Sequence, residues 1–317
     1  MTDKKMKATR VSYGEAITEL GRLHPDIVVL DADLSSATKT ELFRKEFPDR
    51  HIQCGIAEQN MINVAAGLST TGLVPFASSF AMFAAGRAFE MVRNTIGYGH
   101  LNVKIAATHG GISVGEDGAS HQCCEDFALM RSIPGMTVLC PCDDGEAKAM
   151  VKAAYEHEGP VYLRFSRAAS PIIHEKPCDF VIGKGEVLKD GNDGCIIAVG
   201  ITVGEALKAA NSLEAEGIHL RVVNMGSIKP LDEALILQCA KECEWIITIE
   251  EHNVIGGLGE AVAALCSEHH PVRIKRLGVQ DRFGHSGSAA ELLKEYGLTA
   301  ETIIQTVKEM REIHSTE

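Results

Sequence analysis

The chain has 317 residues, of which 45% are hydrophobic and 5% aromatic, and it contains 30 glycines. This length and composition are typical of a globular α/β protein with two domains and a sizeable core, and we expect no disorder outside the ends of the chain. Acidic residues outnumber basic ones by 43 to 31, giving a formal net charge of −12, which argues against nucleic acid as a partner.

The first half of the chain alternates between predicted helices and strands. Ser12 to Glu15 has the pattern of a capping box, which predicts a helix ending near Leu23. A short apolar strand then leads into Asp31-Ala32-Asp33-Leu34-Ser35-Ser36. The predicted strands span 27–30, 74–77, 103–108, 137–140 and 161–164, and the further helices 58–69, 81–96, 125–132 and 145–157. This alternation indicates a mainly parallel sheet with helices on both faces.

The composition changes to Pro, Lys, Gly and Asp between Pro171 and Gly194, which predicts a linker. Beyond it we expect strands at 195–199, 220–224 and 245–250, and a helix capped at 202–205. We therefore predict a first domain at 1–172, a linker at 173–185 and a smaller α/β domain at 186–317. The later Gly256-Gly257-Leu258-Gly259 lacks a full dinucleotide-binding pattern, so we interpret it as tight strand-to-helix packing.

The ten cysteines contain no Cys-x-x-Cys pair of the kind that binds zinc. We expect reduced, mostly buried thiols, which fit a reducing cytoplasm. The charged N-terminus precedes no apolar signal region, and no run of 18 apolar residues is present. We therefore expect a cytoplasmic protein that does not bind membranes.

Three segments concentrate the residues that can perform chemistry: Gly55–Gln59, Ser79–Phe83 and Thr108–His121. Glu58 stands at a predicted helix start, where an acid also stabilises the helix dipole by about 0.3 to 1 kcal/mol. Phe80 and Phe83 are three residues apart, so both can line one pocket, although this spacing is also typical of ordinary core. Aromatic faces of this kind stack against flat rings.

The third segment, Thr108–His121, is rich in glycine, histidine and acidic residues. A metal site is one interpretation of it, with ligands from His109, Glu116, Asp117 and His121. A glycine-rich loop imposes no ligand geometry, however, so we predict no metal ligands in this chain. Buried structural histidines are a second alternative for His109 and His121.

In this order and spacing, the three segments resemble the pyrimidine-binding half of thiamine diphosphate enzymes. Gly115-Glu116-Asp117-Gly118-x-x-His121-Gln122 is similar to transketolase in particular, and the resemblance to the C-terminal half of that family runs from Ala8 to Leu277. The family binds the cofactor's diphosphate through Gly-Asp-Gly and a later Asn, and no Gly-Asp-Gly occurs here. The resemblance therefore implies one subunit of a split enzyme.

The resemblance also implies a fold, a reaction and partners. The fold is a pyrimidine-binding domain with a mainly parallel sheet, followed by a transketolase C-terminal domain that supports a dimer. The reaction transfers a two-carbon ketol unit between sugar phosphates, as in the pentose phosphate pathway. An N-terminal subunit would bind the diphosphate through magnesium or calcium, and the two chains would form a heterotetramer.

Each functional residue receives a role from the same resemblance. Glu58 is implied as the acid that shares a proton with the pyrimidine N1′ of thiamine diphosphate, which requires a partly desolvated carboxyl group within hydrogen-bond reach. Asp117 and His121 are implied as catalytic groups that contact donor hydroxyls, and arginines suit a phosphate dianion. The implied cofactor contacts are Asp33, Leu34, Glu58, Phe80 and Phe83, and the implied substrate contacts are Arg10, Ser36, His109, Asp117, His121 and Arg167.

Three departures from the family pattern bear on sugar specificity. Gly86 replaces a third aromatic residue, His109-Gly110 replaces His-Asp, and Ala37 replaces a phosphate-contacting serine beside Ser36. A 1-deoxyxylulose-5-phosphate synthase-like chain and a β-subunit of a 2-oxo acid dehydrogenase remain alternatives with the same cofactor. From a different class, the chain would be a non-catalytic scaffold subunit.

Overall fold

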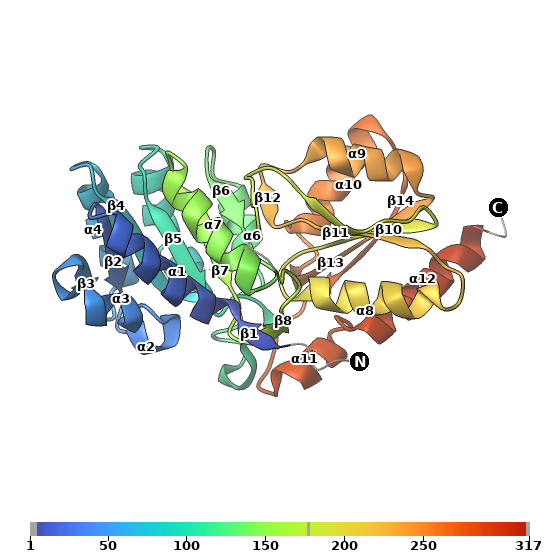
Figure 1. The fold of residues 1–317 in the computed structure, drawn as a ribbon, viewed down its shortest axis with the longest axis horizontal. Coiled ribbons are helices and arrows are strands. Elements are labelled where there is room, and N and C mark those ends of the chain that lie inside the picture. The colour runs from blue at the N-terminus through green and yellow to red at the C-terminus, as the bar shows by residue number, and fades with distance from the viewer. Residues whose placement is uncertain (1–4, 176–177, 315–317) are drawn as a thin grey trace.

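The computed structural model describes residues 5–175 and 178–314, which form two α/β lobes side by side (Figure 1). The first lobe contains a seven-stranded sheet in the order β12-β6-β7-β5-β4-β2-β3, in which only β12 is antiparallel to its neighbour. The second lobe contains a five-stranded sheet in the order β14-β13-β10-β11-β9, with β9 antiparallel. The mainly parallel α/β fold predicted from the sequence is confirmed.

The elements of the first lobe alternate along the chain as predicted. Its strands are β1 (Met6–Ala8), β2 (Ile27–Asp31), β3 (His51–Gln53), β4 (Val74–Phe80), β5 (Lys104–Thr108), β6 (Thr137–Leu139), β7 (Val161–Phe165) and β8 (Ala169–Pro171). Its helices are α1 (Thr9–Leu23), α2 (Ser35–Thr38), α3 (Glu41–Glu46), α4 (Glu58–Ser69), α5 (Phe89–Met91), α6 (Asp126–Arg131) and α7 (Asp144–Glu156). Shorter or irregular turns are η1 (Pro48–Arg50), η2 (Met82–Arg87), η3 (Val92–Gly97) and η4 (Ile112–Asp117).

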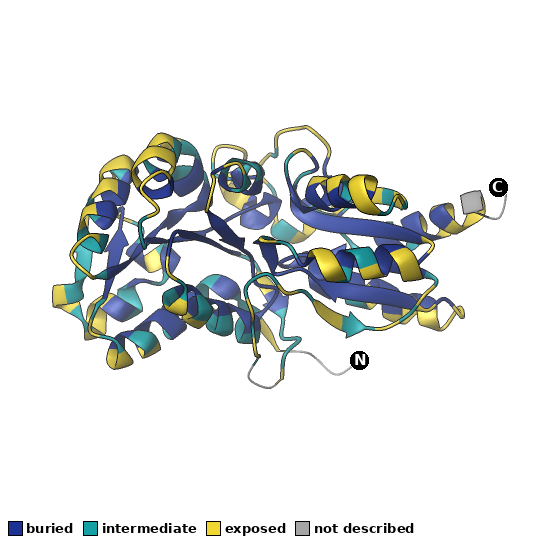
Figure 2. Cartoon of the chain, turned by 90° about the horizontal axis from the view of Figure 1, so that it is seen from above, coloured by how far each residue is buried: buried dark blue, intermediate teal, exposed yellow. Residues whose placement is uncertain are grey.

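The second lobe repeats this alternation. Its strands are β9 (Glu186–Lys189), β10 (Gly194–Ala198), β11 (Leu220–Asn224), β13 (Trp245–Asn253) and β14 (Arg273–Val279), and this part of the chain also contributes β12 (Ser227–Lys229) to the first sheet. Its helices are α8 (Thr202–Glu214), α9 (Glu233–Glu242), α10 (Leu258–His269), α11 (Ala289–Glu295) and α12 (Ala300–His314). Helices lie on both sides of each sheet, and Figure 2 shows buried strands between helices whose outer sides are exposed.

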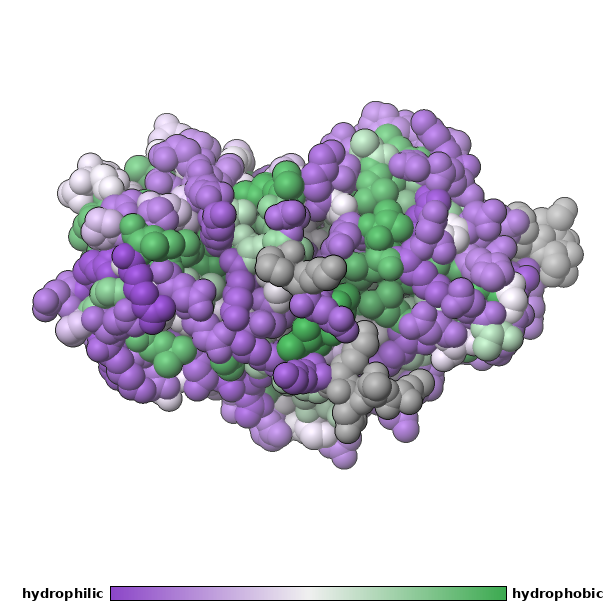
Figure 3. Space-filling model, in the orientation of Figure 1, coloured by the Kyte–Doolittle hydropathy of each residue, from purple (hydrophilic) through white to green (hydrophobic). Residues whose placement is uncertain are grey.

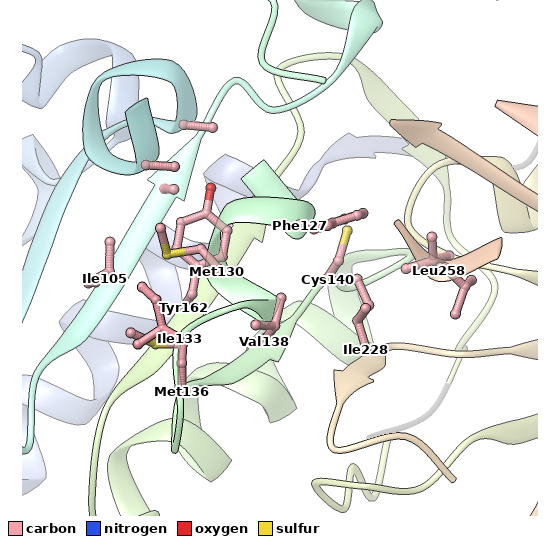
Figure 4. Packing of buried hydrophobic residues seen from close by; sticks show 14 of the residues in the cluster. Ile105, Phe127, Met130, Ile133, Met136, Val138, Cys140, Tyr162, Ile228 and Leu258 are labelled. Carbon is pink, nitrogen blue, oxygen red and sulfur yellow. The ribbon is translucent and has the colours of Figure 1, made fainter. Parts of the chain in front are cut away.

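The two lobes share one hydrophobic core. Strand β12 comes from the second half of the chain but pairs with β6 of the first sheet, with Ser227 opposite Leu139. Figure 4 shows Val138 and Cys140 of the first lobe packed near Ile228 and Leu258 of the second. Burial of such side chains is the main stabilising term in folding. The second lobe therefore supports the first directly.

Several element boundaries differ from the prediction. Helix α1 begins at Thr9, and Ser12 is fully buried within it, so the predicted capping box at Ser12 is wrong. The predicted cap of the next helix at Thr202 is also wrong, because Thr202 is the first residue of α8 and its hydroxyl donates to the carbonyls of Val199 and Ile249. The predicted helix at 81–96 is broken into two π-helical segments, η2 and η3, around α5. Helix α4 and strand β11 have the predicted bounds.

The glycine-rich turn of the second lobe is occupied by the chain itself. The Glu250 carboxylate accepts hydrogen bonds of 2.7 Å from the backbone amides of Leu258 and Gly259 at the start of α10. A side chain on Gly257 would collide with that carboxylate. Helix N-termini bind anions, and here a buried glutamate takes the place that a dinucleotide phosphate would need. This arrangement agrees with the interpretation of the turn as tight packing.

All ten cysteines are free, and eight of them are buried. No described helix has the length and apolar character needed to cross a membrane. The face in Figure 3 is mostly hydrophilic, with smaller hydrophobic groups that include side chains near the boundary between the lobes.

Candidate active site

The carboxyl ends of three neighbouring strands bring the site together. Strands β2, β4 and β5 are parallel, with Asp31 opposite Ser78 and Phe80 opposite Thr108. The loops that leave these strands therefore emerge at one edge of the sheet, where ligands bind in open α/β folds. These loops carry most of the site residues that we predicted from the sequence.

Glu58 is the first residue of helix α4 and is only 2% exposed. Its Oε2 atom accepts a hydrogen bond of 2.9 Å from Arg87 Nη1. The Arg87 side chain is 48% exposed, and its guanidinium lies 4.7 Å above the Phe83 ring. A buried carboxylate requires a partner, and Arg87 provides one from the surface. The Glu58 carboxylate is therefore shielded from water, and a ligand could reach it only from the side that the Arg87 side chain covers.

Four rings form a cluster beside this acid. The Phe80 and Phe83 rings are nearly parallel, with centroids 5.8 Å apart. His109 stacks on Phe80 at 3.8 Å. His121 meets the edges of both phenyl rings, at 6.1 Å from Phe80 and 5.3 Å from Phe83. The structure thus brings together two aromatic residues from the β4 side and two histidines from the loop after β5.

His109 is neutral in this environment. Burial, and then the positive charges of Arg10 and Arg167, lower its pKa to about 3. Arg10 Nη1 lies 3.4 Å from His109 Nε2, and Thr108 Oγ1 lies 2.8 Å from Nδ1. Because arginine can only donate, Nε2 accepts and Nδ1 carries the proton. His109 also has a left-handed backbone, with φ of 58°, which directs its ring over Phe80.

Arg10 and Arg167 form a positively charged pair at the same edge. Burial and then the charge of Arg167 lower the pKa of Arg10, and its Nη1 donates to the carbonyl of Ala37 at 2.9 Å. Arg167 Nη1 donates to the carbonyl of Val114 and to Glu116 Oε2, the latter at 2.5 Å. The Glu116 side chain is 65% exposed, so this ion pair can open toward solvent. Two guanidinium groups at one site favour a doubly charged anion.

The loop after β2 presents Asp33, Leu34 and Ser36. Asp31 builds this loop from a fully buried position, because its carboxylate accepts from the Leu34 amide at 2.5 Å and from the Thr38 and Thr40 hydroxyls at 3.0 Å. Asp33 and Ser36 are exposed, and Asp33 has a φ of 64°. Their side chains therefore point to the outside of the chain rather than into the ring cluster.

Asp117 is the predicted residue that the structure brings least into the cluster. It is the last residue of η4 and is exposed, and among the described residues no contact joins its side chain to the four rings. His121 is half-buried, and its Nδ1 lies 3.0 Å from Ser120 Oγ. That Asp117 and His121 both contact donor hydroxyls stays a prediction.

The second lobe holds the loop that carries Asp117 and His121. Glu251 Oε2 of β13 accepts a hydrogen bond of 3.1 Å from the Ser113 amide. Gln122 Nε2 donates to the carbonyls of Ile112, Gly115 and His285, at 3.2, 3.3 and 3.0 Å. Bonds to buried charged groups stabilise more than neutral ones do. The second lobe therefore fixes the conformation of this loop through hydrogen bonds at Ser113 and Gln122.

Sequence reasoning missed three groups of residues. Arg87, which covers Glu58, lies 29 positions away in a π-helical turn, and no local pattern indicates the contact. Asp31 was recognisable as an acid ending an apolar strand. Buried Arg164, paired with Asp126 Oδ2 at 2.9 Å and bound to the Glu251 carbonyl at 3.0 Å, joins the two lobes through long-range contacts alone.

The residues present fit the pyrimidine end of thiamine diphosphate. A flat heteroaromatic ring needs apolar faces and a buried carboxyl group for its nitrogen, and Phe80, Phe83 and Glu58 supply both. At Gly86, an added Cβ would collide with the flexible methyl end of Met82, so the Met82 side chain fills the space beside this glycine.

Comparisons with known proteins agree with this arrangement. Residues 5–172 match the family model "Transketolase, pyrimidine binding domain", and residues 183–303 match "Transketolase, C-terminal domain". The chain is 51% identical over 306 residues to a putative transketolase C-terminal section of Methanocaldococcus jannaschii, covering 96% of both chains. It is 40% identical to a 6-deoxy-6-sulfo-D-fructose transketolase subunit of a Clostridium species, covering 96% of this chain and 94% of the relative.

A solved structure supports the same relationship. It is described as a split gene transketolase, inactive beta4 tetramer, and it superimposes with a TM-score of 0.89 at 53% identity. The match covers 95% of this chain and 97% of that one.

Proposed function

Because this chain belongs to the transketolase family, we propose that it is the C-terminal subunit of a split transketolase that transfers a two-carbon ketol unit between sugar phosphates. The observation that carries this proposal is the buried Glu58 carboxylate beside the Phe80 and Phe83 rings. A scaffold that had lost catalysis would have no need for a desolvated acid at the mouth of a ring-lined site.

Glu58 acts on a proton in this proposal. Thiamine diphosphate, when bound, supplies the nucleophilic carbon for ketol transfer. Glu58 holds a proton at the pyrimidine N1′, and Phe80 and Phe83 orient the ring and keep water away from that proton. Arg87, which neutralises Glu58 in the chain alone, moves aside toward solvent. Asp33 and Leu34 contribute contacts from the loop after β2.

Arg10, His109 and Arg167 bind the sugar phosphate. The two guanidinium groups provide charge-assisted hydrogen bonds to the phosphate, and Ser36 stands near the carbonyl of Ala37 that already binds Arg10. Neutral His109 carries its proton on Nδ1, so its Nε2 can accept a hydrogen bond from a sugar hydroxyl. His121 lies on the rim of the ring cluster, and we assign Asp117 and His121 to the donor hydroxyls.

A partner subunit completes the site. The sequence contains no Gly-Asp-Gly for diphosphate binding, so an N-terminal chain would supply it together with the magnesium or calcium ion. The solved relative is described as an inactive beta4 tetramer, which supports the expectation that subunits of this kind associate with one another but need a partner for activity. We infer a heterotetramer in the cytoplasm, where ten free thiols remain reduced.

The Glu58→Gln variant in the assembled complex tests the catalytic assignment. We expect kcat to fall by about 100-fold or more, because general acid–base groups contribute on that scale. Glu41→Gln is the matched control, since Glu41 is also the first residue of a helix. If Glu58 only stabilises its helix dipole, both variants will affect stability alone and leave turnover unchanged.

The need for a partner has its own test. This polypeptide alone, supplied with thiamine diphosphate and magnesium, should show no ketol transfer until a chain carrying the diphosphate motif is added. Full activity of the single polypeptide would contradict the split-subunit proposal. A panel of phosphorylated, sulfonated and deoxy ketose donors then assigns the sugar.

A further inference from the structure

The segment that joins the two lobes contains a cluster of side chains of the types that bind metal ions, separate from the ring cluster described above. His174 lies between β8 and β9, and both of its ring nitrogens face carboxylates: Nδ1 is 3.0 Å from Asp143 Oδ1 and Nε2 is 2.8 Å from Glu186 Oε2. A ligand atom from each of His174, Cys178 and Glu186 lies within 4.8 Å of the other two.

We propose that His174 Nε2, Cys178 Sγ and a Glu186 carboxylate oxygen form a binding site for a divalent transition metal ion such as zinc, with Asp143 orienting the imidazole. Imidazole, thiolate and carboxylate are the three ligand types that zinc takes from proteins. The proposal concerns the linker of this chain, and it is independent of the cofactor's own metal ion.

Asp143 is a positioning residue in this site. Its Oδ1 accepts from the Glu146 amide at 2.9 Å, and its Oδ2 accepts from the amides of Ile173 and His174, both at 2.7 Å. The carboxylate is fully buried and has no free oxygen for a metal. A metal-binding histidine usually donates its second ring nitrogen to such a carboxylate. Asp143 therefore directs Nε2 toward Cys178 and Glu186.

A second group of possible ligands, Cys142, Asp143 and His174, lies on the Nδ1 side of the ring. It is less suited to a metal, because Asp143 is saturated by backbone amides and Cys142 is 1% exposed. The Nε2 side is accessible by comparison, since the Glu186 side chain is 49% exposed and Cys178 is half-buried.

Small movements would complete the coordination geometry. Nitrogen and oxygen ligands at about 2.1 Å from a tetrahedral metal lie about 3.4 Å from each other. The present 2.8 Å between His174 Nε2 and Glu186 Oε2 must therefore open by about 0.6 Å, which an exposed glutamate side chain can accommodate. His174 Nε2 and Cys178 Sγ release their protons to solvent as the ion binds.

A cavity of about 710 Å³ adjoins the cluster and gives a metal ion access to water. Its wall includes Cys178, Glu186 and Asn224. Asn224 is 1% exposed, and its Oδ1 accepts no hydrogen bond from any residue that the structure describes. A three-ligand metal site keeps one open coordination position for water, and the cavity provides space for it.

The site would connect three parts of the chain. Asp143 caps helix α7 of the first lobe, His174 and Cys178 lie on the linker, and Glu186 is the first residue of β9 in the second sheet. A metal ion that binds the folded chain but not the unfolded chain raises the stability of the fold by mass action. A bound ion is therefore expected to raise the thermal midpoint of the full chain.

Cobalt titration of the tag-free full chain, stripped with a chelator, tests the proposal. Co²⁺ bound by a thiolate produces a near-ultraviolet charge-transfer band, and we expect one equivalent to saturate it and Zn²⁺ to abolish it. Magnesium should not compete, because it prefers oxygen ligands. Asp143→Asn is expected to weaken Co²⁺ affinity by about 10- to 100-fold, as the loss of a carboxylate that orients a ligand usually does.

Two cysteine variants identify the ligand. Cys178→Ser should lose the band, whereas Cys54→Ser, at the other half-buried cysteine, should keep it. If Cys178→Ser fails to fold by circular dichroism, Glu186→Gln replaces it and should weaken Co²⁺ affinity at least 10-fold. A folded wild-type chain without a charge-transfer band at saturating Co²⁺, or a band that persists in Cys178→Ser, would overturn the proposal.

Discussion

Replacing Gly111 by alanine is expected to destabilise the chain by about 3.5 to 9 kcal/mol, the sum of a backbone, an overpacking and a hydrogen-bond contribution. Gly111 has φ of 82° and ψ of −173°, a backbone conformation that is essentially restricted to glycine and costs other residues about 1 to 3 kcal/mol. An added Cβ would also collide with the Glu251 carboxylate and lie 2.7 Å from Arg164 Nη2.

The collision adds to the backbone cost because its partners cannot move. Arg164 and Glu251 are fully or nearly buried and hold each other and the Ser113 amide. Overpacking a rigid core site costs about 1 to 3 kcal/mol, and loss of a hydrogen bond to a charged group costs about 1.5 to 3 kcal/mol. The predicted loss of stability in Gly111→Ala therefore arises at the contact between the second lobe and the loop after β5.

Two other glycines separate these contributions. Gly72→Ala has a similar φ of 87° but nothing within 4 Å of the added Cβ, so it should cost only about 1 to 2 kcal/mol. Gly67→Ala, in helix α4 with open space around it, should stabilise the isolated chain by about 0.5 to 1 kcal/mol. Urea denaturation followed by circular dichroism measures all three. A loss for Gly111→Ala no larger than that for Gly72→Ala would refute the role assigned to Arg164 and Glu251.

Two further predictions concern the ring cluster. The pKa of His109 is lowered from an ordinary 6.5 to about 3, so the unfolded chain binds the extra proton and stability falls as the pH drops below 6.5. At pH 5 the free energy of unfolding should be about 2 kcal/mol lower than at neutral pH because of this histidine. Urea titrations should show that His109→Asn removes this pH dependence, whereas His269→Asn, at an exposed histidine, keeps it. Arg87→Ala should lower the stability of the isolated chain by about 1 kcal/mol, because its partner is buried but Arg87 is half-exposed, while the assembled enzyme keeps its turnover within a few-fold. Loss of turnover comparable to that of Glu58→Gln would show that Arg87 takes part in the reaction.

Regular elements were predictable wherever one periodic pattern dominated. Helix α4 matches its predicted bounds because its apolar residues follow a single helical face, with Met61, Ile62 and Ala65 all buried. The predicted strand at 74–77 continues to Phe80, because β4 is a central parallel strand buried along its whole length. Ser78 and Ser79 are polar, so the hydrophobic pattern predicted that the strand ends before them. The Ser78 hydroxyl is buried with a hydrogen-bond partner, because Tyr13 Oη lies 2.6 Å from Ser78 Oγ.

Local patterns failed where tertiary contacts decide the structure. The spacing Ser-x-x-Glu occurs at Ser12 inside a helix, whereas the capping box in the structure lies at Ser288 and Glu291. The π-helical turn η2 likewise has no local signature, because its hydrogen bond from the Ala88 amide to the Phe83 carbonyl adds one residue to a turn. Such turns occur often at functional sites, and this one carries both Phe83 and Arg87.

The candidate site divides in the same way. Glu58, Phe80, Phe83, His109 and His121 were selected because three sequence segments resemble the pyrimidine-binding half of thiamine diphosphate enzymes, and the structure brings four of them together as rings. The Glu58–Arg87 pair and the support from Glu251 were not, because each joins residues whose proximity exists only after both lobes have folded.

The position of Glu251 explains why a lobe without cofactor-binding residues belongs in the same polypeptide. Its carboxylate fixes the Ser113 amide, while the His285 carbonyl from the same lobe accepts from Gln122 at the other end of the loop. Asp117 and His121 lie between these two anchors, in a segment where Gly115 and Gly118 both have positive φ and provide little stiffness of their own. A glycine-rich loop loses much conformational entropy on ordering, so its shape must be imposed by contacts from outside. The candidate site residues all lie in the first lobe, and the second lobe adds the contacts that hold the loop residues in place.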